Sequence, residues 1–343
     1  MPDNCTPHRR RPRYRGKHPR GFDEKYKEHD PQRYGETVAK VIASGKTPAG
    51  THRPVMVTEM MQVLAPKPGD VAVDCTLGYG GHAQELLPLI QPGGKLLGLD
   101  ADPIELPRTE ARLRALGFGS EAFTAHRSNF AGLPQVLARL GHAGADIIVA
   151  DLGISSMQID DPSRGFSVKH PGPLDMRMNP QRGQSASALL KRVSPHALVR
   201  LLEENADEPH AVTLGPALAG KFFTTTAALA AAVRATLPRL KKEECDLSIR
   251  RVFQTLRIAV NDEFAALDSF LRILPRCLNP GGRVAILTFH SGEDRRVKKS
   301  FAACLREGTY SEISREVIRP TPAERDSNPR SASAKLRWAR RVA

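Results

Sequence analysis

One stretch of the chain, residues 74–83, has residue types that could hold a nucleotide-like ligand. An acidic residue ending a short apolar run is followed by Gly78, Gly80, Gly81 and His82, and then by a helical pattern. Glycines let a ligand approach the backbone where a Cβ would intrude, and the first turn of a helix offers unpaired N–H groups. The spacing fits a dinucleotide-binding turn and fits equally well a turn that binds S-adenosylmethionine, so these residues alone leave the ligand open.

Two further carboxylates stand at the ends of apolar runs. Asp100 ends the run at residues 95–100, and Asp151 ends the run at residues 145–151. Asp100 follows the glycine turn by about 20 residues, where a carboxylate can accept hydrogen bonds from both hydroxyls of an adenosine ribose. Because parallel strands bind ligands at their carboxyl ends, we expect Asp100 and Asp151 to share one site.

Alternating strand and helix patterns predict an α/β fold that positions these carboxylates. The alternation favours a parallel sheet covered by helices. The expected strands are 71–74, 95–100, 122–126, 145–151 and 283–289, the last preceded by a turn at 279–282, and the expected helices are 58–64, 104–116 and 133–140.

The alternation stops between residues 159 and 245. This stretch has no convincing strand pattern, and we expect an inserted helical domain with helices at 195–202 and 226–235. A single long helix is then expected at residues 253–274, where apolar residues recur every three or four positions and predict packing on the sheet. Its neighbouring face, which carries Arg257 and Asn261, could meet a polar ligand or the inserted domain, or face solvent.

Charge and composition indicate the kind of partner. The chain has 343 residues and a formal net charge of +14, which points to an acidic partner, most simply nucleic acid. Both ends of the chain are rich in arginine. We expect residues 1–50 to be disordered when free, because they have too few apolar residues to offset chain entropy. This tail could bind phosphates or serve only as a solubilising extension.

The cysteines and the hydropathy indicate the compartment. Five widely spaced cysteines form no C-x-x-C pair, which predicts a reducing compartment with neither a disulfide framework nor a metal site. No apolar run approaches the ~18 residues of a membrane span, and the N-terminus lacks the apolar core of a signal peptide. We therefore expect a soluble cytoplasmic protein.

Five stretches together resemble one family. They are DCTLGYGGH at 74–82, DLGISSMQID at 151–160, RGFSVKHPGPLDMRM at 164–178, FQTLRIAVNDE at 253–263 and FHSGEDRRVK at 289–298. On these stretches the chain, from about residue 51 to its end, resembles the bacterial small-subunit ribosomal RNA cytosine-N4 methyltransferase family, called RsmH or MraW.

The resemblance implies a fold, a cofactor and a reaction. The fold would be a Rossmann-like class I S-adenosylmethionine-dependent methyltransferase domain at 51–158 and 246–343, interrupted by a substrate-recognition domain at 159–245. The reaction would methylate the exocyclic amine of a cytidine in the decoding region of small-subunit ribosomal RNA. Members of the family are often dimers, so a homodimer is one implied state. The cofactor contacts carried over are Gly80, Gly81, His82, Asp100, Phe130, Asp151 and Gln158.

A cytosine amine is a poor nucleophile, because its lone pair is delocalised into the ring, and it must lose a proton once methylated. An acceptor for its N–H bonds would favour attack. Asp151 is the first candidate for this role or for gripping the cofactor, and the sequence leaves both open. Asp175 and His290 are secondary candidates as base or as reader of the base edge.

The target base must also leave its stack to reach the cofactor. Phe166 could stack on this base, or it could belong to the core. Arg164 and Arg177 could meet flanking phosphates, and Arg257 and Asn261 are further candidate substrate contacts.

Three other functions remain open. The first is an NAD-dependent dehydrogenase, although Asp74 and the stretch at 151–153 argue against it. The second is an amino-methyltransferase acting on DNA or another RNA. The third is a non-catalytic RNA-binding assembly factor, against which the intact Asp100 and Asp151 argue.

Overall fold

The computed structural model describes residues 54–169 and 171–343 of the chain. The expected tail at residues 1–50 lies outside these residues, so that prediction stays open. Within the described residues, no helix is both long enough and apolar enough to cross a membrane.

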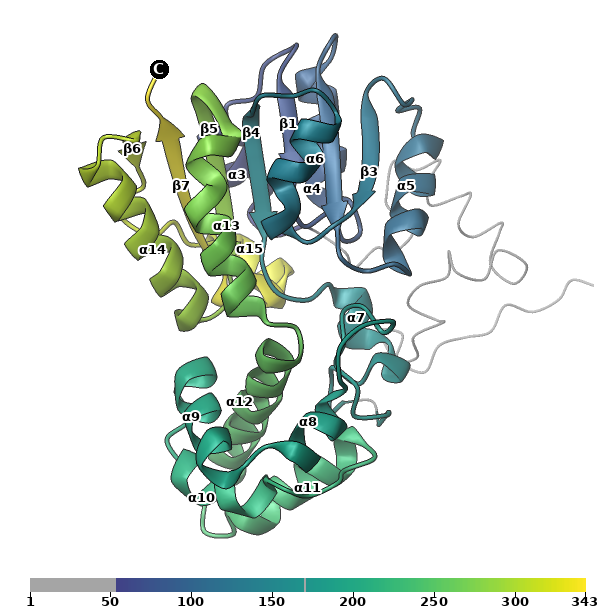
Figure 1. Ribbon diagram of the computed structural model, residues 1–343, viewed down its shortest axis with the longest axis vertical. Coiled ribbons are helices and arrows are strands. Elements are labelled where there is room, and N and C mark those ends of the chain that lie inside the picture. The colour runs from purple at the N-terminus through teal and green to yellow at the C-terminus, as the bar shows by residue number, and fades with distance from the viewer. Residues whose placement is uncertain (1–53, 170) are drawn as a thin grey trace, which may run out of the picture. The chain divides into compact units, whose positions relative to one another are not determined.

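A seven-stranded sheet has the strand order β3-β2-β1-β4-β5-β7-β6 (Figure 1). Strands β1 to β5 pair in parallel, and β7 runs antiparallel to both of its neighbours. The strand order reverses between β1 and β4, which is where such sheets bind ligands at their carboxyl ends. The Rossmann-like α/β class is therefore confirmed. The strands are β1 (Val71–Asp74), β2 (Lys95–Asp100), β3 (Phe123–Arg127), β4 (Ala145–Asp151), β5 (Leu278–Thr288), β6 (Tyr310–Ile313) and β7 (Lys335–Arg341).

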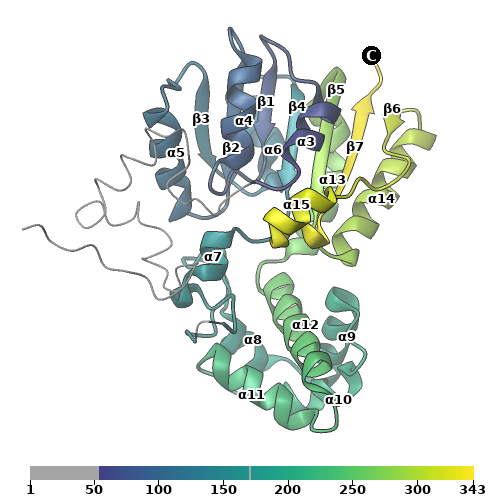
Figure 2. The same ribbon diagram turned by 180° about the vertical axis from the view of Figure 1, so that it is seen from behind.

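Helices cover both faces of the sheet. Alternate residues of a central strand enter opposite cores, as Ile147 and Ile148 of β4 do, which explains why the strands read as nearly continuous apolar runs. One face carries α3 (Val57–Leu64), α4 (Gly81–Ile90) and α5 (Glu105–Ala115) (Figure 2), and the other carries α6 (Leu133–Arg139), α13 (Glu263–Cys277) and α14 (Ser291–Arg306) (Figure 1).

The C-terminal part of the sheet differs from expectation. Strands β6 and β7 were not predicted, and β7 places part of the basic C-terminal segment inside the sheet. Arg337 of β7 is 6% exposed and donates to Asp294 at 2.6 Å, so this positive charge is neutralised within the fold. Strand β5 begins earlier than expected, and its pairing with β4 is irregular across residues 279–282, where a turn was predicted. A short helix, α15 (Pro322–Ser327), precedes β7.

The inserted segment forms a third hydrophobic core of its own. Phe166, Leu174 and Met176 from the preceding loop join this core. Helices α9 and α11 match the two helices expected from the sequence, whereas α8 and α10 were not predicted. The helices are α8 (Ala186–Arg192), α9 (Pro195–Ala206), α10 (Ala211–Leu218), α11 (Thr226–Thr236) and α12 (Lys242–Val260).

The expected long helix at 253–274 is two helices, and this prediction was wrong. Asp262 adopts φ 49°, a left-handed conformation that an α-helix cannot continue through. Phe253 of α12 packs in the insert core, whereas Leu267 of α13 packs on the sheet. The predicted boundary at residue 245 falls inside α12, and we propose that the inserted domain extends to Val260.

Candidate active site

The turn between β1 and α4 is shaped by its glycines. Gly78 and Gly80 have φ values of 47° and 78°, which glycine adopts without a Cβ penalty. A Cβ on Gly80 would lie 3.0 Å from Cγ2 of Thr109, and one on Gly81 would lie 2.9 Å from Cβ of Pro54. Packing within the chain therefore requires these glycines, and a cofactor contact at Gly80 and Gly81 stays a prediction.

Asp100 joins the glycine turn to the loop after β2. Its Oδ2 accepts from the Gly78 N–H at 2.7 Å, and its Oδ1 accepts from the Asp102 N–H at 2.8 Å. Burial raises the pKa of Asp100 to about 6, even though both hydrogen bonds act in the opposite direction. Each carboxylate oxygen keeps a second lone pair, so Asp100 can still accept a hydrogen bond from a ligand hydroxyl.

Phe130 lies next to the same strand end. It begins the short 3-10 turn Phe130–Gly132, and the Ser128 N–H donates to the carbonyl oxygen of Asp100 at 3.0 Å. The half-buried ring packs against Phe270 with ring centroids 5.3 Å apart. The chain thus reaches Phe130 two residues after this bond to the end of β2, and a contact of Phe130 with the cofactor stays a prediction.

His82 and Asp151 face each other at the carboxyl ends of β1 and β4. Nε2 of His82 lies 3.5 Å from Oδ2 of Asp151, and the two side chains are 6% and 30% exposed. Burial lowers the pKa of His82, but the neighbouring Asp151 and Asp74 outweigh it, so the net shift is upward. Burial also raises the pKa of Asp74 to about 6. The backbone N–H of Asp151 donates to Oγ1 of Thr76 at 2.6 Å, which fixes the strand end.

The His82 ring is buried without hydrogen bonds. A separation of 3.5 Å is too long for a good hydrogen bond, and within the described residues neither ring nitrogen has another partner. Buried polar atoms are normally paired with protein, water or ligand. The two unpaired ring nitrogens of His82 could therefore form hydrogen bonds with a polar group of a ligand.

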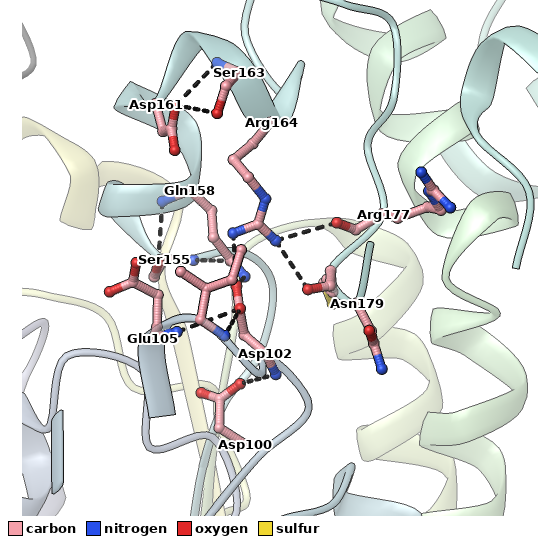
Figure 3. Close-up of polar contacts among 12 residues, drawn as sticks. Asp100, Asp102, Glu105, Ser155, Gln158, Asp161, Ser163, Arg164, Arg177 and Asn179 are labelled. Atoms are coloured by element: carbon pink, nitrogen blue, oxygen red, sulfur yellow. Dashed lines mark hydrogen bonds and ion pairs between the residues drawn. The ribbon is translucent and has the colours of Figure 1, made fainter. Parts of the chain in front are cut away.

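Asp102, which was not predicted as a site residue, has a buried carboxylate that accepts two side-chain hydrogen bonds (Figure 3). It is 1% exposed, and its Oδ2 accepts from Nε2 of Gln158 and from Nη1 of Arg164, each at 2.8 Å. Gln158 also forms a capping box with Ser155 at the start of α7 (Ser156–Asp160). The Gln158 amide thus has internal partners, and its cofactor contact stays a prediction. The available signal was an Asp-x-Asp pattern at the end of β2.

Arg164, expected to meet a phosphate, is buried and bonded within the chain, which argues against that role. Arg164 is 7% exposed, and besides its bond to Asp102 its Nη2 donates to the carbonyl oxygens of Arg177 at 3.2 Å and Met178 at 2.9 Å (Figure 3). The guanidinium therefore joins the loop at residues 177–178 to Asp102, which follows β2. Phe166 is 8% exposed and belongs to the insert core, which favours the core alternative over base stacking.

Asp175 and Arg177 form a bidentate ion pair. Nε of Arg177 lies 2.9 Å from Oδ1 of Asp175, and Nη2 lies 2.7 Å from Oδ2. Burial raises the pKa of Asp175, but the hydrogen bonds and charge of Arg177 outweigh burial and hold that pKa below its ordinary value. A carboxylate held ionised in this way is a weak base, which argues against Asp175 as the proton acceptor.

Arg257 and Asn261, expected as substrate contacts, support the junction of α12 and α13. Arg257 donates to Glu263 through two bonds of 2.8 Å. Asn261 accepts from the Met178 N–H at 2.7 Å and donates to the carbonyl oxygen of Met176 at 2.8 Å. Both side chains therefore tie the helix junction and the loop at 176–178 together, and an RNA contact by either residue stays untested.

His290 precedes α14 and has its own partner. Its Nε2 lies 3.1 Å from Oε1 of Glu293, and its ring packs against Phe264 at 5.7 Å. Burial raises the pKa of Glu293, but His290 outweighs burial and the net shift is downward. Within residues 54–169 and 171–343, no hydrogen bond or ion pair joins His290 or Asp175 to Asp151. The three catalytic candidates are not one bonded group.

The fold and the site together define the class of protein. A glycine turn after β1 and carboxylates at the ends of β2 and β4 are features of a Rossmann-like α/β protein that binds a nucleotide-type ligand at its strand ends. Among the described residues, no group of three or more His, Cys, Asp or Glu side chains is placed to hold a metal ion.

Comparison with known proteins then gives the family. Residues 49–342 match the model of the MraW methylase family, and the chain belongs to that family. It is 49% identical to ribosomal RNA small subunit methyltransferase H 1 of Lachnoclostridium phytofermentans over 97% of this chain and 93% of that protein. It is also 49% identical to ribosomal RNA small subunit methyltransferase H 2 of Alkaliphilus metalliredigens, over 96% of this chain and 97% of that protein. The resemblance seen in the sequence is confirmed.

Proposed function

We propose that this chain is an S-adenosylmethionine-dependent methyltransferase that methylates the N4 amine of a cytidine in the decoding region of small-subunit ribosomal RNA. Membership of a methylase family and near full-length relatives named as small-subunit ribosomal RNA methyltransferases support this proposal. The structural observation that carries it is the His82–Asp151 pair, which lies beside the glycine turn with Asp151 still partly exposed.

The residues around the strand ends fit S-adenosylmethionine, which bears a cationic sulfonium and an ammonium group. The charges of Asp100 and Asp151 add to the rise in the pKa of Asp74, and His82 is buried beside Asp74 and Asp151 with unpaired ring nitrogens. When bound, this cofactor supplies an electrophilic methyl group on sulfur. In this assignment Gly80, Gly81 and His82 hold the methionine end, Asp100 binds the ribose and Phe130 contacts the adenine. Gln158 supports Asp100 indirectly, because its amide donates to Asp102, whose N–H donates to Asp100.

Asp151 is assigned to the cytosine amine. One of its oxygens lies 3.5 Å from Nε2 of His82, its backbone N–H donates to Thr76, and the side chain remains 30% exposed. The carboxylate would accept an N–H bond from the amine, localise the lone pair on N4, and take up the proton that the methylated nitrogen must lose. Asp175 and His290 are occupied by Arg177 and Glu293, so they are placed second.

The inserted domain is assigned to RNA recognition. The target base must leave its stack to reach a site at the strand ends, and the loop that leads from β4 into the insert lies beside that site. Arg177 is 24% exposed, and although it pairs with Asp175, it is the loop arginine assigned to a flanking phosphate.

The experiment that tests this function is a methyl-transfer assay. The protein is incubated with S-adenosylmethionine labelled on the methyl group and with undermethylated small ribosomal subunits, and the RNA digest is analysed by mass spectrometry. Labelled N4-methylcytidine is expected. Label on the cytosine ring carbon, or no labelled nucleoside, would refute the proposal.

A variant separates the two roles open to Asp151. Asp151→Asn should lower kcat by about 10²- to 10⁴-fold, the usual range for a lost general base, with the Kd for S-adenosylmethionine nearly unchanged. Asp326→Asn, at an exposed carboxylate of α15, is the matched control and should behave as wild type. A raised cofactor Kd with kcat intact would instead assign Asp151 to cofactor binding.

The oligomeric state and the cellular location are proposed from the family resemblance as well. A homodimer is proposed, and sedimentation equilibrium at micromolar protein would refute it by giving only the 37.5 kDa mass of one chain. A cytoplasmic location is proposed because the substrate is ribosomal RNA, and cell fractionation tests it.

A further inference from the structure

Phe222 is the one exposed Phe, Tyr or Trp side chain within residues 54–169 and 171–343, with 63% of its surface accessible. It lies in the loop between α10 and α11, directly before Phe223, which is buried in the insert core. The two neighbouring rings therefore differ in role. Phe223 anchors the loop, whereas Phe222 presents an apolar face to solvent and has no stabilising function in the core.

The loop that carries Phe222 is docked on the end of α8. The Gly220 N–H donates to the carbonyl oxygen of Leu190 at 2.9 Å, and Lys191 and Arg192 are the next and last residues of α8. Figures 1 and 2 both show α8 and α11 side by side. Nζ of Lys191 lies 5.7 Å from the ring centroid, near the outer limit of a cation–π contact.

Positive charge on this part of the insert is not balanced locally. Lys191, Arg192 and Lys221 are all exposed. No Asp or Glu occurs between Asp175 and Glu203, or between Glu208 and Glu243, so α8, α10 and α11 carry no carboxylate. An exposed aromatic ring among unpaired cations is complementary to single-stranded nucleic acid, whose bases stack and whose phosphates are anionic.

We propose that Phe222, together with Lys191, Arg192 and Lys221, forms a stacking platform for an unpaired base of the RNA substrate. This proposal rests on the proposed function, since it takes RNA as the substrate. Helix α8 begins at the Asp175 loop, where the Ala186 N–H donates to the carbonyl oxygen of Asp175 at 2.8 Å. Its 7 residues rise about 10 Å from that loop, and the platform is assigned to nucleotides other than the target cytidine.

The test is equilibrium binding of the full-length protein to fluorescently labelled small ribosomal subunits, without added cofactor. Phe222→Ala should weaken binding by roughly 5- to 150-fold, the usual effect of removing one stacked base contact, whereas Phe222→Trp should keep wild-type affinity. Lys191→Ala and Lys221→Ala should each reduce the salt dependence of binding, lowering the log–log slope by about 1. Val212→Ala, at a 72% exposed residue of the same domain, is the matched control.

The outcomes distinguish stacking of an RNA base on the platform from an apolar contact with a protein. Phe222→Leu keeps apolar area but loses the aromatic face, so wild-type affinity of this variant would point to an apolar protein contact and overturn the proposal. Unchanged affinity of Phe222→Ala would overturn it as well. If wild-type protein binds subunits but transfers no methyl group, the proposed function fails while the platform is still tested by the binding series.

Discussion

Removing one partner of the Asp102–Arg164 pair should strongly destabilise the protein. The two side chains are 1% and 8% exposed and are joined by a bond of 2.8 Å. Breaking a buried ion pair by removing one partner usually costs about 3–5 kcal/mol, because the remaining charge stays buried without compensation. At about 2–4 °C per kcal/mol for a domain of this size class, Arg164→Met should lower the Tm by roughly 6–20 °C.

Thermal unfolding gives the Tm, and urea unfolding gives the free energy of unfolding; both are followed by circular dichroism and by the fluorescence of the single tryptophan, Trp338 of β7. Two probes are needed because the insert has its own core and could unfold separately from the sheet. The matched control is Glu110→Gln, which breaks a surface pair with Arg114 whose side chains are 35% and 37% exposed. Surface pairs contribute less than about 1 kcal/mol, so the control should stay close to wild type.

A double-mutant cycle sharpens this prediction. Asp102→Leu combined with Arg164→Met removes both charges, so the double variant should be more stable than the sum of the single losses implies. A loss below about 1 kcal/mol for Arg164→Met, equal to the Glu110→Gln control, would refute the view that this pair holds the loop to the strand ends.

The remaining predictions concern the cofactor site and the helix junction. Because burial raises the pKa of Asp100, the carboxylate assigned to the ribose, to about 6, it gains a proton as pH falls through 6, and affinity for S-adenosylmethionine should fall by up to about tenfold per pH unit below 6. Calorimetric titration between pH 7.5 and 5 checks this, and a flat Kd profile would count against it. Asp151→Asn removes a charge that raises the pKa of His82, so an NMR titration should show a lower His82 pKa than in wild type; an unchanged value would show that the two do not interact. Asn261→Ala leaves backbone groups unpaired and should reduce the free energy of unfolding by about 2 kcal/mol in urea titrations, and a loss within error would contradict those bonds.

The sequence alone determined the nucleotide-type half of the fold. The strand, glycine turn and helix around Gly80, and the carboxylates Asp100 and Asp151 at strand ends, are local patterns with a fixed spatial meaning. Parallel strands must end at one edge of the sheet, so residues that end such strands meet there wherever they fall in the chain. The five motifs in series likewise identified the family without reference to the structure.

The tertiary structure decided which charged residues are free to act. The sequence predicted that Arg164 contacts a phosphate. Its partner Asp102 lies 62 residues away in sequence, and no local pattern joins the two residues. Asn261 similarly pairs with Met178 across 83 residues. A sequence shows that a residue is charged, but only the packing shows whether a partner has already neutralised that charge. For the same reason the unpaired cations around Phe222 became apparent only when the loop was seen docked on α8.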